Sequence, residues 1–103
     1  MKLRGKRKRF LRARANRLQP IFAVGKEGLS DNWLAQLDGA LDRRELIKVN
    51  ILQNADVTTA EVKNFIESKT NIQVVQTIGR VLVLFKVSAN KDMRNLSDQV
   101  AKV

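Results

Sequence analysis

The sequence predicts a small α/β domain in which helices pack against a mixed four-stranded sheet. Apolar residues recur at helical spacing in three segments, and four short apolar or alternating runs have the character of strands. The predicted order is helix–strand–helix–strand–helix–strand–strand. A chain of 103 residues suits one domain and is too short for two.

The first helix is predicted over residues 5–18. Leu11, Ala15 and Leu18 form one apolar stripe, and basic residues fill the rest of the circumference. Pro20 should end this helix, because proline disfavours a helical conformation at the residue before it.

Ile21 to Val24 is a wholly apolar run, which predicts a strand buried on both faces. The loop Gly25–Gly28 follows it. Ser30 is the expected N-cap of the second helix. The apolar face of that helix comprises Leu34, Leu37 and Leu41, and Arg43 and Arg44 lie in its last turn, where the helix dipole favours cations.

Leu46 to Leu52 alternates between apolar and polar residues, as a half-exposed strand does. Thr58 and Glu61 have the spacing of a capping box and should open a third helix. The segments Ile72–Gln76 and Val81–Val87 complete the set of strands, with a turn at Ile78-Gly79.

Two pairing rules give the expected topology. The strand–helix–strand unit favours parallel pairing, and the last two strands favour an antiparallel hairpin. We therefore expect one domain over residues 1–87, including the basic helix, followed by a polar C-terminal extension or frayed helix over 88–103.

Positive charge is concentrated at the start of the chain. The net charge is +10, and residues 1–20 contain nine basic residues and no acidic one. The remaining residues contain eleven basic and ten acidic residues, a net charge of only +1. Charge segregated in this way predicts a polyanionic partner.

Composition argues against several classes of protein. Cysteine and histidine are both missing, which removes thiol nucleophiles, imidazole bases and the usual zinc ligands. We expect no enzyme activity, no cofactor and no metal. No apolar run is long enough for a membrane span or a secretory signal, so we expect a cytoplasmic protein without a membrane partner.

Three features are candidates for function. The Gly25–Gly28 loop lies between a strand and a helix N-terminus, where backbone N–H groups and Lys26 can bind phosphate. Taken alone, the four loop residues favour a tight structural turn over a phosphate site. The basic helix fits phosphate contact better than a solvated face, because nine unneutralised charges repel one another. Lys48, Asn50 and Arg80 could extend this surface or simply be solubilising residues.

Acidic residues give no metal constellation. Asp38 and Asp42 can share one helix face, and the neighbouring Arg43 and Arg44 predict ordinary surface pairing.

Three segments in this order resemble the CRM domain in its stand-alone bacterial YhbY-like form. They are Val24–Leu29, Arg44–Val49 and Gln76–Lys86, and the opening residues 3–12 also match the start of that family. The resemblance covers residues 3–87. Glu27 and the pair Phe85-Lys86, where the family usually has Tyr-Arg, depart from the family pattern.

The resemblance implies a fold similar to the C-terminal domain of translation initiation factor 3. It also implies binding of ribosomal RNA or pre-ribosomal particles, through the glycine loop and a basic surface. We expect a monomeric ribosome assembly factor; an integral ribosomal protein or general RNA chaperone, a DNA-binding protein and an RNA-modifying enzyme are alternatives. The expected RNA contacts are Arg4, Lys6, Arg7, Lys8, Arg9, Arg12, Gly25, Lys26, Gly28, Lys48 and Arg80.

Overall fold

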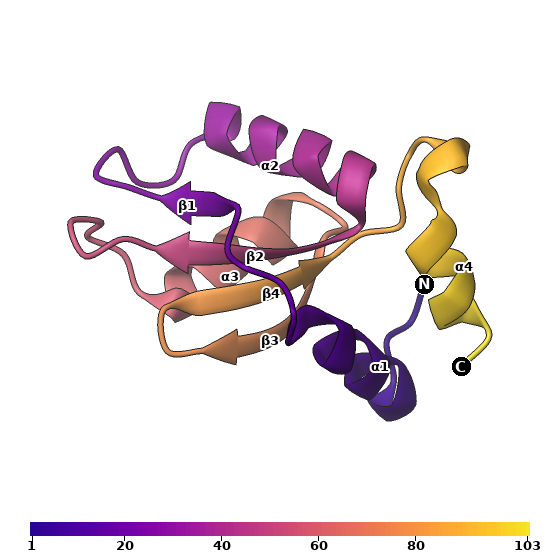
Figure 1. Ribbon diagram of the computed structural model, residues 1–103. Helices are drawn as coiled ribbons and strands as arrows, with labels where there is room; N and C mark the ends of the chain where they lie inside the picture. Colours follow the sequence, from indigo (N-terminus) through magenta and orange to yellow (C-terminus); the bar gives the residue numbers. More distant parts are fainter.

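Helices cover both faces of one central sheet in the computed structural model, which describes residues 1–103 (Figure 1). Helices α2 (Asp31–Arg44) and α3 (Thr59–Lys69) lie on one face. Helices α1 (Gly5–Ala15) and α4 (Asn95–Ala101) lie on the other. The strands are β1 (Phe22–Val24), β2 (Leu46–Ile51), β3 (Gln73–Ile78) and β4 (Val81–Phe85), and a short 3-10 helix, η1, spans Lys91–Met93.

The strand order in the sheet is β1-β2-β4-β3. Strands β1 and β2 are parallel, whereas β4 is antiparallel to both β2 and β3. The predicted mixed four-stranded α/β fold is therefore confirmed, including the parallel strand–helix–strand unit and the C-terminal hairpin.

The larger core lies between the sheet and helices α2 and α3. Alternate residues of β2 and β4 face it, because successive side chains of a strand point to opposite faces. Its fully buried members include Leu37, Leu41, Val49, Ile66 and Leu82.

A smaller core lies on the opposite face, under α1 and α4. Leu11 and Ala15 of α1 pack here against Val83 and Phe85 of β4. The sequence-predicted stripe of the first helix therefore does dock on the sheet. The helix itself ends at Ala15, three residues earlier than predicted, and a turn follows in which the Leu18 N–H donates to the Ala15 carbonyl at 2.9 Å.

Both predicted helix starts are confirmed by their caps. The Ser30 hydroxyl accepts from the Trp33 N–H at 3.0 Å. Thr58 and Glu61 form a complete capping box, with bonds of 3.1 and 3.0 Å in the two directions. Each cap satisfies backbone donors that the first turn of a helix leaves without a partner.

Strand β1 is not buried on both faces, contrary to the sequence-based prediction. Ile21 is 49% exposed and Ala23 is exposed, while Val24 is fully buried. The reason is that α1 covers only part of its face of the sheet, so the other part stays open. The last strand is likewise shorter than predicted, and it ends at Phe85 rather than Val87.

The C-terminal segment is a packed helix, where the sequence suggested a polar extension or a frayed helix. Val100 of α4 is fully buried in the smaller core. Glu45 fixes the connection to this helix: its carboxylate accepts from the backbone N–H of Ser88 at 2.8 Å and of Ser97 at 2.9 Å. Glu45 itself is fully buried and has a left-handed backbone, with φ 63°.

Asp38 and Asp42 both pair with Lys86. The prediction from the sequence, that they pair with the neighbouring Arg43 and Arg44, is wrong. The Lys86 ammonium lies 2.8 Å from a carboxylate oxygen of each. Burial is the largest influence on both Asp42 and Lys86 and opposes their charged forms. For Asp42, the hydrogen bonds from the Ala89 N–H and from Lys86 outweigh burial and lower the pKa. For Lys86, the hydrogen bonds to Asp38 and Asp42 outweigh burial and raise the pKa.

These shifts predict the pH dependence of stability. A lowered Asp42 pKa contributes stability that is lost as pH falls below about 4, and a raised Lys86 pKa contributes stability that is lost as pH rises above about 10. Lys86→Met should lower the free energy of unfolding at pH 7 by about 1–3 kcal/mol, since methionine keeps the packing but donates no bond. Urea titrations across pH would show a flatter acid limb in the variant; an identical limb would contradict this role.

Candidate functional site

Most of the predicted RNA contacts fall into two groups at opposite ends of the sheet. The glycine loop, the β2–α3 connection and the β3–β4 hairpin gather at one end, at the left in Figure 1. The N-terminal half of α1 lies at the other end, beside α4. Leu46 at one end of β2 lies under α1, and Ile51 at the other end lies beside the loop. Five residues of a strand span about 17 Å, so the two groups are separated by about this distance along the sheet.

The loop Gly25–Gly28 offers a short row of unpaired donors. A turn closes it, in which the Gly28 N–H donates to the Gly25 carbonyl at 3.0 Å. Gly28 has φ 73°, a conformation that a side chain would strain. The backbone N–H groups of Gly25, Lys26 and Glu27 have no partner within the protein. Successive free N–H groups of this kind can bind an anion.

Lys26 and Glu27 occupy the exposed tip of the loop. Neither side chain makes an ion pair or hydrogen bond within the protein, so both charges are available to a ligand. The Glu27 carboxylate does not neutralise Lys26 through a direct contact.

Arg80 lies at the same end of the sheet but has a structural role there. Its guanidinium donates to the carbonyls of Ile51, Leu52 and Ala55, at 3.3, 3.0 and 3.3 Å. It thereby fixes the β2–α3 connection beside the loop, because Leu52 also lies next to Gly25. Arg80 can present positive charge to a ligand only through the part of its guanidinium that these bonds leave exposed.

The N-terminus of α1 carries several cations and has neither a side-chain cap nor an acidic residue beside them. The N-cap residue Arg4 makes no side-chain capping bond, and the first turn contains no acidic residue. Lys6, Lys8 and Arg9 instead add cations where the helix dipole is already positive. An anion bound here would relieve both the repulsion and the unsatisfied N–H groups.

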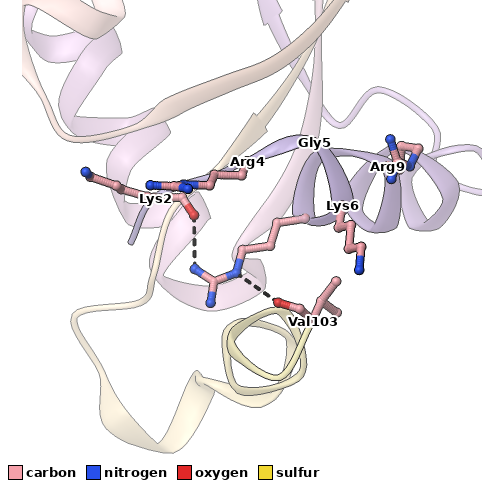
Figure 2. A pocket seen from close by; sticks show the side chains of 7 residues that line it. Lys2, Arg4, Gly5, Lys6, Arg9 and Val103 are labelled. Atoms are coloured by element: carbon pink, nitrogen blue, oxygen red, sulfur yellow. Dashed lines mark hydrogen bonds between the residues drawn. The ribbon is translucent and has the colours of Figure 1, made fainter.

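A hollow of about 630 Å³ lies at this helix end (Figure 2). Six of the residues that line it are Lys2, Arg4, Gly5, Lys6, Arg7 and Arg9, and the seventh is Val103. Arg7 differs from the others, because its guanidinium donates to the backbone carbonyls of Lys2, Ala101 and Val103. Arg7 therefore joins α1 to α4, while the other cations around the hollow keep their charges exposed.

The C-terminal half of α1 and the turn after it add two cations that were not among the predicted RNA contacts. Arg14 lies 5.3 Å from the centre of the Phe10 ring and donates to Gln99 of α4. Arg17 is exposed beside it and lines a second hollow with Phe10, Ala13 and Arg14. The charge run in the sequence includes both residues, but only the packing of α1 shows which of them face solvent.

Lys48 and Asn50 lie between the two ends. They share the face of the sheet that α1 partly covers, since they alternate with the core residues Ile47, Val49 and Ile51. Both side chains are half-buried, and neither makes a hydrogen bond or ion pair within the protein.

The structure contains no group of three or more histidine, cysteine, aspartate or glutamate residues that could hold a metal ion. None of its helices has the length and apolar character needed to cross a membrane. The candidate site consists of the free backbone donors of the glycine loop and the exposed cations, most of which belong to α1.

Comparison with known proteins agrees with the fold and with the sequence motifs. The profile of the CRS1 / YhbY (CRM) domain matches residues 3–86. The chain belongs to this family. The predicted resemblance is thereby confirmed over nearly the same residues, and the glycine loop and α1 both lie inside the CRM domain.

Named relatives cover most of the chain. A Bacillus subtilis relative named "Probable RNA-binding protein YqeI" is 49% identical over 86 residues, which are 84% of this chain and 90% of the relative. A Haemophilus influenzae relative named "RNA-binding protein" is 39% identical over 83 residues, which are 81% of this chain and 84% of the relative. The solution structure of SAV1595 from Staphylococcus aureus has a TM-score of 0.70 and 39% identity, over 87% of this chain and 94% of that one.

Phe85 and Lys86, where the resemblance implies Tyr-Arg, both have contacts within the protein. Phe85 is fully buried in the smaller core, and Lys86 bonds to Asp38 and Asp42. Both residues lie at the end of the sheet opposite the glycine loop. The replacement therefore concerns packing and an internal ion pair and not the loop.

Proposed function

We propose that this CRM-domain protein binds structured RNA, from the large ribosomal subunit, and acts in ribosome assembly. The observation that carries the proposal is the segregated charge of α1, whose cations surround a hollow at an uncapped helix N-terminus. Phosphate groups supply the negative charge that this surface lacks. The names of the Bacillus and Haemophilus relatives support RNA as the partner.

The glycine loop is proposed as a second, separate phosphate contact. Its three free N–H groups and Lys26 lie about 17 Å along the sheet from the packing contacts of α1. A single phosphate cannot reach both, so the ligand must be extended, as an RNA helix or strand is. Phosphate contacts of this kind fix the position of the nucleic acid without reading its sequence.

The loop contact is tested by a matched pair of substitutions at Gly25. A Cβ atom there would lie 3.8 Å from the Leu52 side chain, an ordinary contact, so both Gly25→Asp and Gly25→Asn should fold. Gly25→Asp should weaken RNA binding about 10-fold or more, because a carboxylate then faces the phosphate, whereas Gly25→Asn should lose much less. Equal affinities of the two variants would contradict a phosphate contact at the loop.

The assembly role is tested by gradient fractionation of cell extracts. We expect the protein on precursors of the large subunit and its release by a high-salt wash, because the contacts are electrostatic. Retention on mature subunits after that wash would instead identify an integral ribosomal component.

A further inference from the structure

One half of the second sheet face has no helix over it. Helix α1 covers Val75, Val83 and Phe85, all of which are buried. The adjacent row across the sheet is Ala23, Asn50, Val81 and Ile78, one residue from each strand. Together with Ile21 and Lys48 of the same face, we call this row the open sheet face.

The open sheet face combines apolar and polar groups without any carboxylate. Ile78 is 52% exposed and Ile21 is 49% exposed, two of the most exposed large apolar side chains in the protein. Asn50 and Lys48 lie between them, and their polar atoms make no bond within the protein. Val81 is half-buried and continues the apolar surface between Asn50 and Ile78.

The position of this face relates it to the two proposed phosphate contacts. Asn50 is next to Ile51, which lies level with the end of β1 where the glycine loop begins. Lys48 is only two residues from Leu46, which packs under α1. The open sheet face therefore lies between the two proposed phosphate contacts, where one RNA that reaches both can contact it.

We propose that the open sheet face binds unpaired nucleotides of the same RNA, so that the protein recognises a junction between duplex and single-stranded RNA. The inference rests on the proposed function. Bases stacked inside a duplex expose only their edges, whereas unpaired bases expose faces that can cover Ile78, Val81 and Ile21. Asn50 can bond to a base edge, and Lys48 to a phosphate or base oxygen.

The basic surroundings favour a nucleic acid over a protein at this face. Arg12 belongs to the adjoining helix α1, Arg17 to the turn that follows it, and Lys26 to the loop at the other side. The face contains no aromatic ring, so bases cannot stack on one as they do in many proteins that bind single-stranded nucleic acid. They would contact aliphatic side chains instead. We therefore expect little discrimination among bases, except where Asn50 meets an edge.

The test measures affinity of the full chain for two RNAs, a blunt duplex and the same duplex with a single-stranded extension. Wild type should bind the extended RNA about 5-fold or more tightly, on the scale expected when the exposed part of one isoleucine side chain is buried. Ile78→Ser and Asn50→Ala should each remove most of this preference and leave the affinity for the blunt duplex unchanged. Met93→Ser is the matched control, because Met93 is a 43% exposed apolar residue outside this face.

The outcomes separate the inference from the proposed function. Equal binding of both RNAs by wild type, or equal effects of Ile78→Ser and Met93→Ser, would overturn the inference alone. No binding of either RNA would overturn the proposed function as well. Loss of self-association in Ile78→Ser, measured by analytical ultracentrifugation without RNA, would show that the face joins two copies of the chain and would also overturn the inference.

Discussion

Replacing Lys6, Lys8 and Arg9 by glutamine should weaken RNA binding about 100-fold at 0.15 M salt. Each lost phosphate contact flattens the log–log salt dependence by about 0.7–0.9, so three contacts flatten it by about 2–3. Arg7 is left in place because it bonds to three backbone carbonyls and joins α1 to α4. The measurement is an equilibrium titration of one RNA at several salt concentrations.

A second triple variant controls for net charge. Arg43, Lys63 and Lys91 are exposed, make no hydrogen bond or ion pair through their side chains, and lie outside α1. Replacing them by glutamine changes the charge by the same amount. We expect a much smaller loss of affinity, and equal losses in the two triple variants would show that only the net charge of the protein matters.

Glu45→Ala should lower the free energy of unfolding by about 2–6 kcal/mol. The substitution leaves the backbone N–H groups of Ser88 and Ser97 without their acceptor, and each unsatisfied buried donor costs about 1–3 kcal/mol. Alanine keeps the same need for a left-handed backbone at this position, so a change in backbone strain does not obscure the result. Denaturant unfolding measures the loss.

Hydrogen exchange locates where the Glu45 variant is weakened. Amides of α4 should exchange faster than in wild type, since Ser97 lies in the first turns of that helix. Glu45→Gln, which retains one acceptor oxygen, should lie between alanine and wild type. Unchanged exchange in α4, together with an unchanged free energy of unfolding, would contradict the role of Glu45 as its anchor.

The sequence predicts the order and pairing of the elements well because these follow from local signals. The caps at Ser30 and Thr58 and the alternation in β2 each act within a few residues, and the structure confirms all three. The boundaries of α1, β3 and β4 differ from the predicted ones, and Ile78, predicted to lie in a turn, is the last residue of β3. Tertiary contacts set these limits, and local periodicity does not record them.

The features that the sequence did not predict depend on contacts between distant residues. The packing of α4 requires Glu45 to bond with Ser97, 52 residues away. The pairing of Lys86 with Asp38 and Asp42 joins a strand end to a helix that precedes it by more than 40 residues. The exposure of Ile21 and Ala23 depends on how far α1 extends over the sheet.

The candidate site shows the same division. The sequence shows that the glycine loop can adopt a tight turn and that the first helix is strongly basic. The structure places the two at opposite ends of one sheet. It also assigns bonds within the protein to Arg7 and Arg80, two of the eleven expected contacts. Side-chain partners of this kind cannot be recognised from a run of positive charge.

Binding of the wild-type protein to large-subunit ribosomal RNA fragments across a salt series tests the central claim most directly. Contact with about five phosphates predicts a log–log slope of about −3.5 to −4.5, and duplex DNA should compete poorly if the surface fits the A-form geometry of RNA. A salt-independent affinity, or equal competition by duplex DNA, would contradict binding of structured RNA through α1 and the glycine loop.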